Sequence, residues 1–225
     1  MDADRVGIAG NIQSIKKELP SEVKLVAVSK FHPSEAIREA LDAGQTVFGE
    51  NRPQEFEKKA IELQDCGIEW HFLGHLQTNK LKMVLPYASL VQSVDSVHLL
   101  EEINDWGAKN KRVISVLLEL HVAAEDSKQG FYEDEALDIL FRADSFRNVR
   151  FCGLMGMATN TDCEEDIRAD FGRIKAFYDY VRDLFPEYES FRELSIGMSG
   201  DWRIALEYGA TMVRIGTAIF GERVY

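Results

Sequence analysis

The sequence has little cysteine, and it lacks long apolar runs, dense basic clusters and low-complexity linkers. Its cysteines, Cys66, Cys152 and Cys163, are odd in number and lack the spacing of a metal site, which predicts reduced thiols in a cytosolic protein. The most apolar segment, 113–118, is far too short to cross a bilayer. Because no Ser/Pro-rich stretch divides the 225 residues, we expect one domain over residues 1–225.

Positive charge is also in short supply, since the formal net charge is −12 at pH 7. Such a balance disfavours a surface for nucleic acid or for an anionic membrane. The opening residues 1–6 carry neither the basic start nor the apolar stretch of a signal peptide. We therefore expect a cytoplasmic protein without nucleic-acid or membrane partners. With 45% hydrophobic residues, the chain can bury a large core.

Short apolar runs alternate along the chain with amphipathic helical patterns. An opening helix sets Ile8, Ile12, Ile15 and Leu19 on one face. Strands are predicted at 23–29, 46–49, 69–73, 89–93, 112–120, 150–157, 192–196 and 211–215. Helices are predicted between them at 34–43, 53–64, 97–108, 133–143 and 164–184. This order predicts an α/β fold, a single closed (β/α)8 TIM-type barrel with an extra N-terminal helix, and an open doubly wound sheet is the main alternative.

Polar residues follow several of the predicted strands, where a parallel barrel gathers its chemistry at the C-terminal mouth. They are Lys30, Glu50, Asn51, His75, Asp95, Glu119, His121, Ser199 and Arg214. His71 and His75 lie on and after a strand without the pattern of a zinc site, so no metal is expected. A Ser/His/Asp hydrolase is disfavoured because the Gly-x-Ser-x-Gly turn is missing.

Two consecutive turns near the C-terminus are suited to a phosphate. They lie in SIGMSGD (195–201) and MVRIGTAIFG (212–221), where a strand end passes through glycine and hydroxyl residues into a helix start. The unpaired N–H groups and the helix dipole there favour an anion. Ser199, Gly216 and Thr217 are the candidate contacts, although Ser199 could simply cap a helix.

Lys30 ends the first predicted strand. Its parity with Val26 and Val28 places it on an apolar face, where desolvation favours the neutral amine that an imine requires. A solvated charge at a strand end is the alternative. Together with the phosphate turns, the lysine indicates a phosphate-bearing aldehyde held as a Schiff base.

Three further residues are candidates for contact with the rest of such a ligand. Arg214 shares a strand with Met212, and its guanidinium can only donate a hydrogen bond, so it would leave a pyridine nitrogen unprotonated. Asn51 could bond a ring hydroxyl or pack as a turn residue. Met157 could lie against the ring or fill the core.

Taken together, the motifs resemble those of the pyridoxal phosphate homeostasis protein family, whose barrel is alanine-racemase-like. The matching runs are VAVSK (26–30), FGEN (48–51), HFLGHLQTNK (71–80), GLMGM (153–157) and both C-terminal motifs. The resemblance implies a barrel like the N-terminal domain of alanine racemase, with pyridoxal 5'-phosphate (a vitamin B6 form) as a covalent aldimine on Lys30. It also implies the remaining contacts: Arg214 at the pyridine nitrogen, Ser199, Gly216 and Thr217 at the phosphate, and Asn51 and Met157 beside the ring.

The resemblance further implies a role in binding and delivering the cofactor, with apo pyridoxal-phosphate enzymes as partners, a monomeric or weakly dimeric state and no substrate turnover. A small amino-acid racemase is the alternative. The racemases take an opposing tyrosine from an additional domain, whereas this sequence stops at Tyr225, which favours the carrier. A Schiff-base aldolase or sugar-phosphate isomerase is a third possibility. Phe31-His32 and Arg52-Pro53 depart from the usual family pattern around the ring.

Overall fold

Eight parallel strands close into a barrel in the computed structural model, which describes residues 7–122 and 129–222. The strands are β1 (Lys24–Val28), β2 (Val47–Glu50), β3 (Glu69–Phe72), β4 (Leu90–Val94), β5 (Ile114–Leu120), β6 (Val149–Gly156), β7 (Glu193–Ser195) and β8 (Met212–Ile215). Each pairs with the next in sequence, and β8 pairs back with β1. The closed barrel is confirmed, and the open sheet is excluded. Residues 1–6, on which the expectation about a signal peptide rests, and Tyr225 lie outside the described residues.

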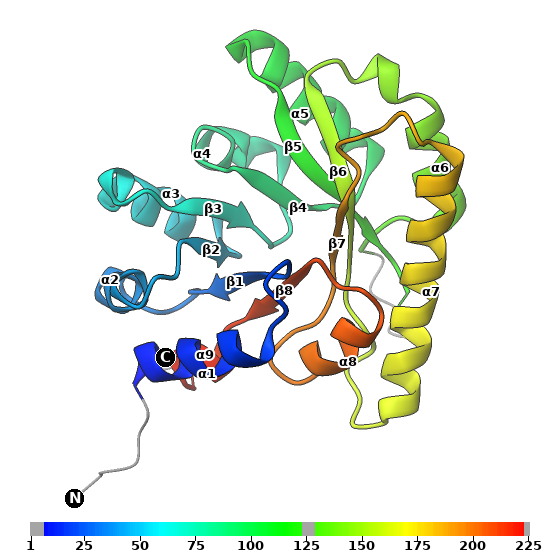
Figure 1. Cartoon of the computed structure of the whole chain (residues 1–225). Helices are drawn as coiled ribbons and strands as arrows, with labels where there is room; N and C mark the ends of the chain where they lie inside the picture. The colour runs from blue at the N-terminus through cyan, green and yellow to red at the C-terminus, as the bar shows by residue number, and fades with distance from the viewer. Residues whose placement is uncertain (1–6, 123–128, 223–225) are drawn as a thin grey trace, which may run out of the picture.

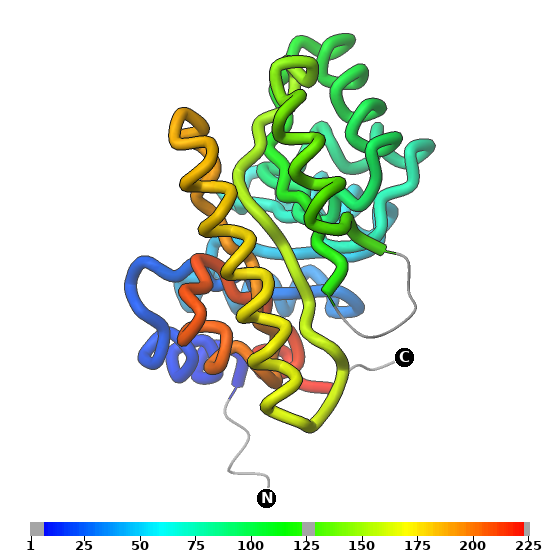
Figure 2. Tube along the Cα trace, turned by 90° about the vertical axis from the view of Figure 1, so that its right-hand side faces the viewer, coloured from blue at the N-terminus to red at the C-terminus, as the bar shows by residue number. Residues whose placement is uncertain are grey.

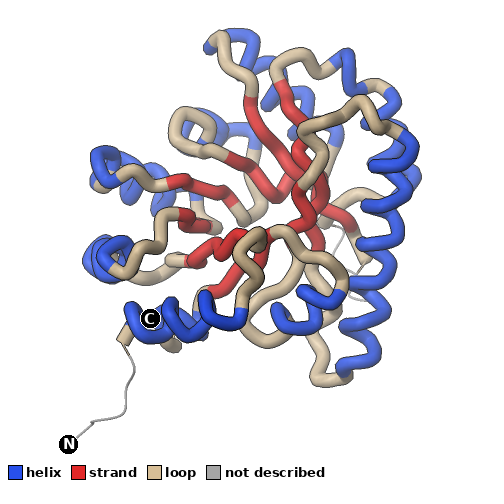
Figure 3. Tube along the Cα trace, viewed as in Figure 1, coloured by secondary structure: helices blue, strands red, loops and turns tan. Residues whose placement is uncertain are grey.

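Helices surround the strands, as Figure 1 and Figure 3 show. They are α1 (Ile8–Glu18), α2 (Ser34–Asp42), α3 (Pro53–Glu62), α4 (Leu81–Val84), α5 (Val97–Asn110), α6 (Glu133–Phe141), α7 (Glu164–Leu184), α8 (Trp202–Glu207) and α9 (Thr217–Phe220), with short 3-10 turns at Gln64–Cys66, Thr78–Lys80 and Ala143–Ser145. The extra helix α1 contacts α2 and α9, and Asn11 Nδ2 donates to the carbonyl of Ile219 at 2.9 Å. The long helix α7 runs along one side of the barrel (Figure 2).

Strand side chains alternate between two apolar layers, as the period of two requires. One layer lies between strands and helices and includes Leu25, Ala27 and Phe48. The other fills the lumen and comprises Val26, Val47, Leu90, Leu117, Met155 and Met212. The alternation therefore fixes which residues of each strand face the barrel axis. At the C-terminal strand ends, the residues with this inward parity point into the mouth.

A β-bulge in strand β6 sets the direction in which two methionine side chains point. The β5–β6 register shifts between Val116 and Leu117, so that Cys152 is the extra residue on β6. At Gly153, φ is +148° and an added Cβ would lie 1.8 Å from the carbonyl oxygen of Glu193, so only glycine fits. Beyond this bulge, Met155 faces the lumen and Met157 reaches the mouth.

Candidate functional site

A cavity of about 280 Å³ opens at the mouth of the barrel. All the residues predicted to contact a cofactor line it: Lys30, Asn51, Met157, Ser199, Arg214, Gly216 and Thr217. They come from the ends of β1, β2, β6 and β8 and from the loop after β7, which are scattered over most of the sequence. The fold thus brings together every residue of the predicted set. Their individual roles toward a ligand stay predictions.

Lys30 extends the inward face of β1 into this cavity. Val26 belongs to the lumen layer, Val28 lines the cavity, and half-buried Lys30 follows at the same parity. The next residue, Phe31, has φ +68°, a conformation that costs a bulky side chain strain and turns the chain sharply. The lysine therefore sits between an apolar strand and a strained turn.

A buried ionic network holds the backbone on both sides of Lys30. Lys59 Nζ donates to the carbonyl of Ser29 at 2.8 Å and to carboxylate oxygens of Glu50 and Glu55, each at 2.7 Å. Ser29 Oγ donates to Glu50 at 2.7 Å, and the Phe31 N–H donates to Glu55 at 2.7 Å. Burial raises the pKa of Glu50 to about 7, although the Lys59 ammonium opposes the rise.

This placement of Glu50 corrects the expectation that it faces the mouth. On β2, Val47 points into the lumen and Phe48 points outward, so Glu50 at the parity of Phe48 points outward toward α3. Lys59 was not singled out in the sequence, because a lysine on an amphipathic helix looks like any solvated charge. Its near-complete burial, with 5% exposed, is a tertiary property.

The two departures from the usual family pattern pack against each other and against helix α9. The Arg52 guanidinium carbon lies 4.4 Å from the centroid of the Phe31 ring, a cation–π contact. The His32 ring stacks on Phe220 at 5.0 Å. These residues therefore join the loops after β1 and β2 to α9 at one edge of the cavity.

Asn51 lines the cavity and carries a buried acceptor without a partner. Its Oδ1 is buried and has no hydrogen-bond donor among the described residues. The backbone behind it is closely packed, since a Cβ at Gly74 would lie 2.0 Å from the Asn51 carbonyl oxygen, and Ser93 Oγ donates to the Gly74 carbonyl at 2.6 Å. A buried acceptor without a donor is costly unless a ligand supplies one, and a ring hydroxyl would do so.

Arg214 is buried, with 5% of its surface exposed, rather than paired on the surface. Its Nη1 donates to the carbonyl and the hydroxyl of Ser195 at 2.6 and 2.7 Å, and its Nη2 donates to the Gly156 carbonyl at 2.9 Å. Burial lowers the pKa of Arg214 to about 10, and Asp201 and Glu119 oppose the fall. The guanidinium remains a cation and a donor at neutral pH.

The two glycine-containing turns are tied to each other at the cavity. The Gly216 N–H donates to Ser199 Oγ at 3.3 Å, and the Arg214 N–H donates to the Gly197 carbonyl at 2.9 Å. An added Cβ at Gly216 would lie 3.1 Å from the Val28 carbonyl oxygen, so the turn approaches β1 closely. Ser199 and the exposed Thr217 add hydroxyl groups to this rim, which suits an anionic group.

A second cavity of about 600 Å³ adjoins the first and shares Met157, Met198 and Gly200 with it. Its wall includes Glu119 and His121, which the sequence placed at the mouth. Burial raises the pKa of Glu119 to about 7, and Asp95, which lies 2.7 Å from His75, adds to the rise.

Comparison with known proteins decides the family. The family model described as the alanine racemase N-terminal domain matches residues 4–224. The pyridoxal phosphate homeostasis protein of Aquifex aeolicus is 41% identical over 203 residues, covering 90% of this chain and 88% of that protein. The protein of the same name from Escherichia coli is 35% identical over 209 residues, covering 92% and 88%. The chain belongs to the pyridoxal phosphate homeostasis protein family.

Solved structures agree with this assignment. PipY of Synechococcus elongatus, solved with pyridoxal phosphate bound, superposes with a TM-score of 0.89 at 35% identity, covering 95% of this chain and 100% of that chain. An alanine racemase of Clostridium difficile has a TM-score of 0.76 at 15% identity, covering 96% of this chain and 56% of that one, and therefore shares the fold. In the described part of this family member, no helix has the length and apolar character to cross a membrane.

Replacing Glu119 with glutamine in this family member is expected to stabilise the fold above pH 7 and to change little at pH 5. A carboxyl whose pKa rises on folding, here from 4.5 to about 7, retains its proton in the folded state, so stability falls as pH rises through that window. Glutamine removes the cost of the buried charge, on the order of 2 kcal/mol at pH 8. Urea unfolding at both pH values measures the difference. Glu101→Gln, on the exposed face of α5, is the control; an equal effect of Glu119→Gln at both pH values would contradict the assignment.

Proposed function

We propose that this protein binds pyridoxal 5'-phosphate covalently through Lys30 and serves the cellular balance and delivery of that cofactor, without turning over a substrate of its own. The observation that carries the proposal is the single cavity lined by Lys30, Asn51, Arg214 and the two C-terminal turns. The presence of pyridoxal phosphate in the solved structure of PipY supports the same ligand here.

Lys30 would provide the covalent link. The bound cofactor supplies an aldehyde carbon that condenses with a primary amine. Lys30, with its neutral amine, would hold the cofactor covalently, with loss of one water molecule. Val28 and the strained turn at Phe31 hold the lysine at the cavity, while the Lys59 network fixes the backbone on either side.

The other residues would hold the ligand without covalent bonds. Asn51, which lines the cavity and has a buried, unpartnered Oδ1, would accept a hydrogen bond from the ring hydroxyl. Arg214 donates to the ring nitrogen and leaves it unprotonated. Ser199, Gly216 and Thr217 bind the phosphate through hydroxyl and N–H groups. Met157, which is 40% exposed, covers one side of the ring.

The cavity supports a carrier better than a racemase. Racemisation by two bases needs a proton acceptor on each side of the substrate carbon. Among the described residues that line the cavity, the titratable side chains are Lys30, His32 and Arg214, and none is a tyrosine. Arg214 cannot accept a proton at neutral pH, so a second base beside Lys30 would have to be His32, whose ring stacks on Phe220. We propose a cytoplasmic monomer or weak dimer that passes the cofactor to apo enzymes.

Borohydride trapping tests the proposal. The purified protein is mixed with pyridoxal 5'-phosphate, reduced and digested, and racemase activity is assayed in parallel on common amino acids. We expect the reduced adduct on the peptide that contains Lys30 and no racemase turnover above the protein-free rate. An adduct confined to other lysines would overturn the covalent assignment, and sustained racemisation would overturn the carrier role.

A further inference from the structure

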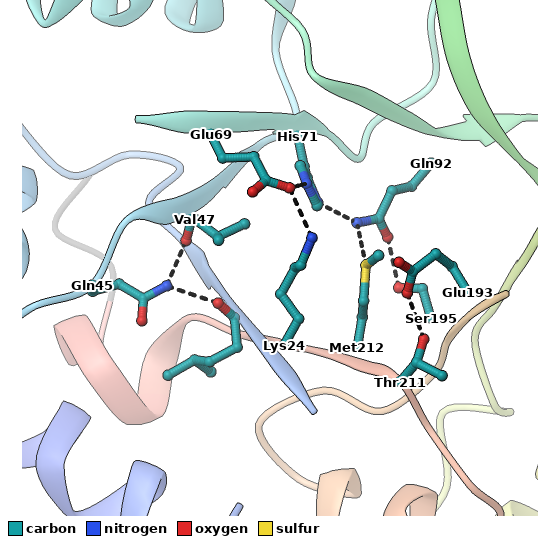
Figure 4. Close-up of polar contacts among 11 residues, drawn as sticks. Lys24, Gln45, Val47, Glu69, His71, Gln92, Glu193, Ser195, Thr211 and Met212 are labelled. Atoms are coloured by element: carbon teal, nitrogen blue, oxygen red, sulfur yellow. Dashed lines mark hydrogen bonds and ion pairs between the residues drawn. The ribbon is translucent and has the colours of Figure 1, made fainter. Parts of the chain in front are cut away.

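A chain of buried polar side chains runs through the lumen from the cofactor cavity to the opposite end of the barrel. Ser195 on β7 contacts Gln92 on β4 at 2.6 Å, Gln92 contacts His71 on β3 at 2.8 Å, and His71 contacts Glu69 at 2.9 Å. Figure 4 shows these four side chains in succession across the barrel. Ser195, Gln92 and His71 are completely buried, so water cannot replace any of these bonds.

The groups at the two ends of this row of side chains, Glu69 and Arg214, dictate the direction of every hydrogen bond between them. Glu69 is a carboxylate, because the hydrogen bond from His71 lowers its pKa to about 2, and a carboxylate can only accept. His71 Nε2 must therefore carry the proton. Burial lowers the pKa of His71 and keeps the ring neutral, so its Nδ1 must accept from the Gln92 amide N–H. That orientation turns Gln92 Oε1 toward the Ser195 hydroxyl.

The hydroxyl of Ser195 then has one remaining role. Its proton is committed to Gln92 Oε1, so its lone pair faces Arg214, whose Nη1 donates to it at 2.7 Å. If every hydrogen bond in this row were reversed, the Ser195 hydroxyl proton would point at the Arg214 guanidinium, which can only donate. The dipoles along the chain all place their negative ends toward the cation, which stabilises Arg214 without a carboxylate in contact with it.

We propose that Ser195, Gln92 and His71 form a one-directional positioning relay, which connects the Glu69 carboxylate on the far face to Arg214 and holds its guanidinium in place at the cofactor cavity. The relay rests on the proposed function in one respect: the ligand atom that Arg214 faces is then the ring nitrogen of pyridoxal phosphate. Glu69 also pairs with Lys24 Nζ at 2.9 Å, so the relay acts on Arg214 through its oriented dipoles and not through an unpaired charge.

The protein without ligand gives the first test, by ¹⁵N NMR of histidine-labelled protein. We expect His71 as the neutral tautomer with its proton on Nε2. Gln92→Met removes the glutamine's hydrogen bonds to His71, Ser195 and the Met212 sulfur, and it should shift the Nδ1 resonance. Gln45→Met is the matched control, because Gln45 is almost as deeply buried and its partners among the described residues are the carbonyls of Leu25 and Val47. A proton on Nδ1 in the wild-type protein would overturn the relay.

Binding of pyridoxal 5'-phosphate gives the second test. We expect Gln92→Met to weaken binding about tenfold, near the upper end of what one buried hydrogen bond contributes, because Ser195 loses the acceptor that orients it toward Arg214, while Gln45→Met leaves binding within twofold. Equal affinities of Gln92→Met and wild type would refute the relay. Complete absence of binding by the wild-type protein would instead overturn the proposed function, and the His71 spectrum would still decide the direction of the chain.

A second pair of variants covers the case in which Gln92→Met does not fold. Glu69→Gln removes the charge at the end of the relay, and Glu193→Gln removes a charge from the same face, where Glu193 accepts from Thr211 Oγ1 at 2.7 Å. Figure 4 shows both glutamates. We expect Glu69→Gln to shift the His71 resonances and weaken binding about threefold, and Glu193→Gln, whose charge acts on His71 without a hydrogen bond to it, to have a much smaller effect on both. Equal effects of both variants would refute the relay.

Discussion

Replacing Lys30 with alanine is expected to abolish covalent binding of pyridoxal 5'-phosphate while the barrel remains folded. Lys30 is the one lysine among the described residues that line the cavity, so no neighbouring amine can take its place. Its side chain is half-buried at the mouth rather than packed in the core, and the change in stability should stay within about 1 kcal/mol. The absorbance of the adduct and mass spectrometry after borohydride reduction measure the loss.

The phosphate turns do not depend on Lys30, so the alanine variant should keep weaker, reversible binding. Titration without reductant would detect it. Lys58→Ala is the matched control, since Lys58 is exposed on α3 and is not among the residues that line the cavity. This variant should form the adduct like the wild-type protein. The same reduced adduct in Lys30→Ala, at wild-type yield, would refute the assignment of the lysine.

Replacing Lys59 with methionine is expected to cost about 3 kcal/mol of stability at pH 8, because it leaves Glu50 buried without its cation. The cost should shrink toward pH 5. The pKa of Glu50 is already raised to about 7 by burial, so below that pH the folded protein holds a neutral carboxyl that needs no partner. Urea unfolding at the two pH values measures both quantities.

Two further variants isolate the ionic part of this effect. Adding Glu50→Gln to Lys59→Met removes the unpaired carboxylate and should restore part of the stability at pH 8. Lys58→Met makes the same substitution on the exposed face of α3 and should change stability by less than about 0.5 kcal/mol. A loss below 1 kcal/mol for Lys59→Met at pH 8 would show that the network does not support the Lys30 turn.

The strands were predictable from sequence because buried parallel strands are short apolar runs between helical patterns. All eight were located, with boundaries shifted by one or two residues, as at 112–120 against Ile114–Leu120 and 89–93 against Leu90–Val94. The ends were less certain because pairing with neighbouring strands, and not the local pattern, decides where a strand stops. The one-turn helix α4 was missed, since four residues carry no measurable period.

The residues around the cavity were predictable for a related reason. Parallel strands deliver their C-terminal ends to one mouth, so lysine, asparagine and arginine at strand ends converge whatever their spacing in sequence. Glu50 was misplaced because its parity on β2 turns it outward to Lys59, and the strand is too short for the sequence alone to fix that parity.

The sequence by itself determined the barrel, its family and the set of side chains at its mouth, because these follow from local periodicity and from the order of motifs along the chain. Only the tertiary structure decided which polar groups meet inside. Gln92 and Ser195 are 103 positions apart, and closure of the sheet alone brings them to 2.6 Å. Once they are buried away from water, each donor there must find an acceptor in the barrel, and that requirement sets the direction of the whole chain.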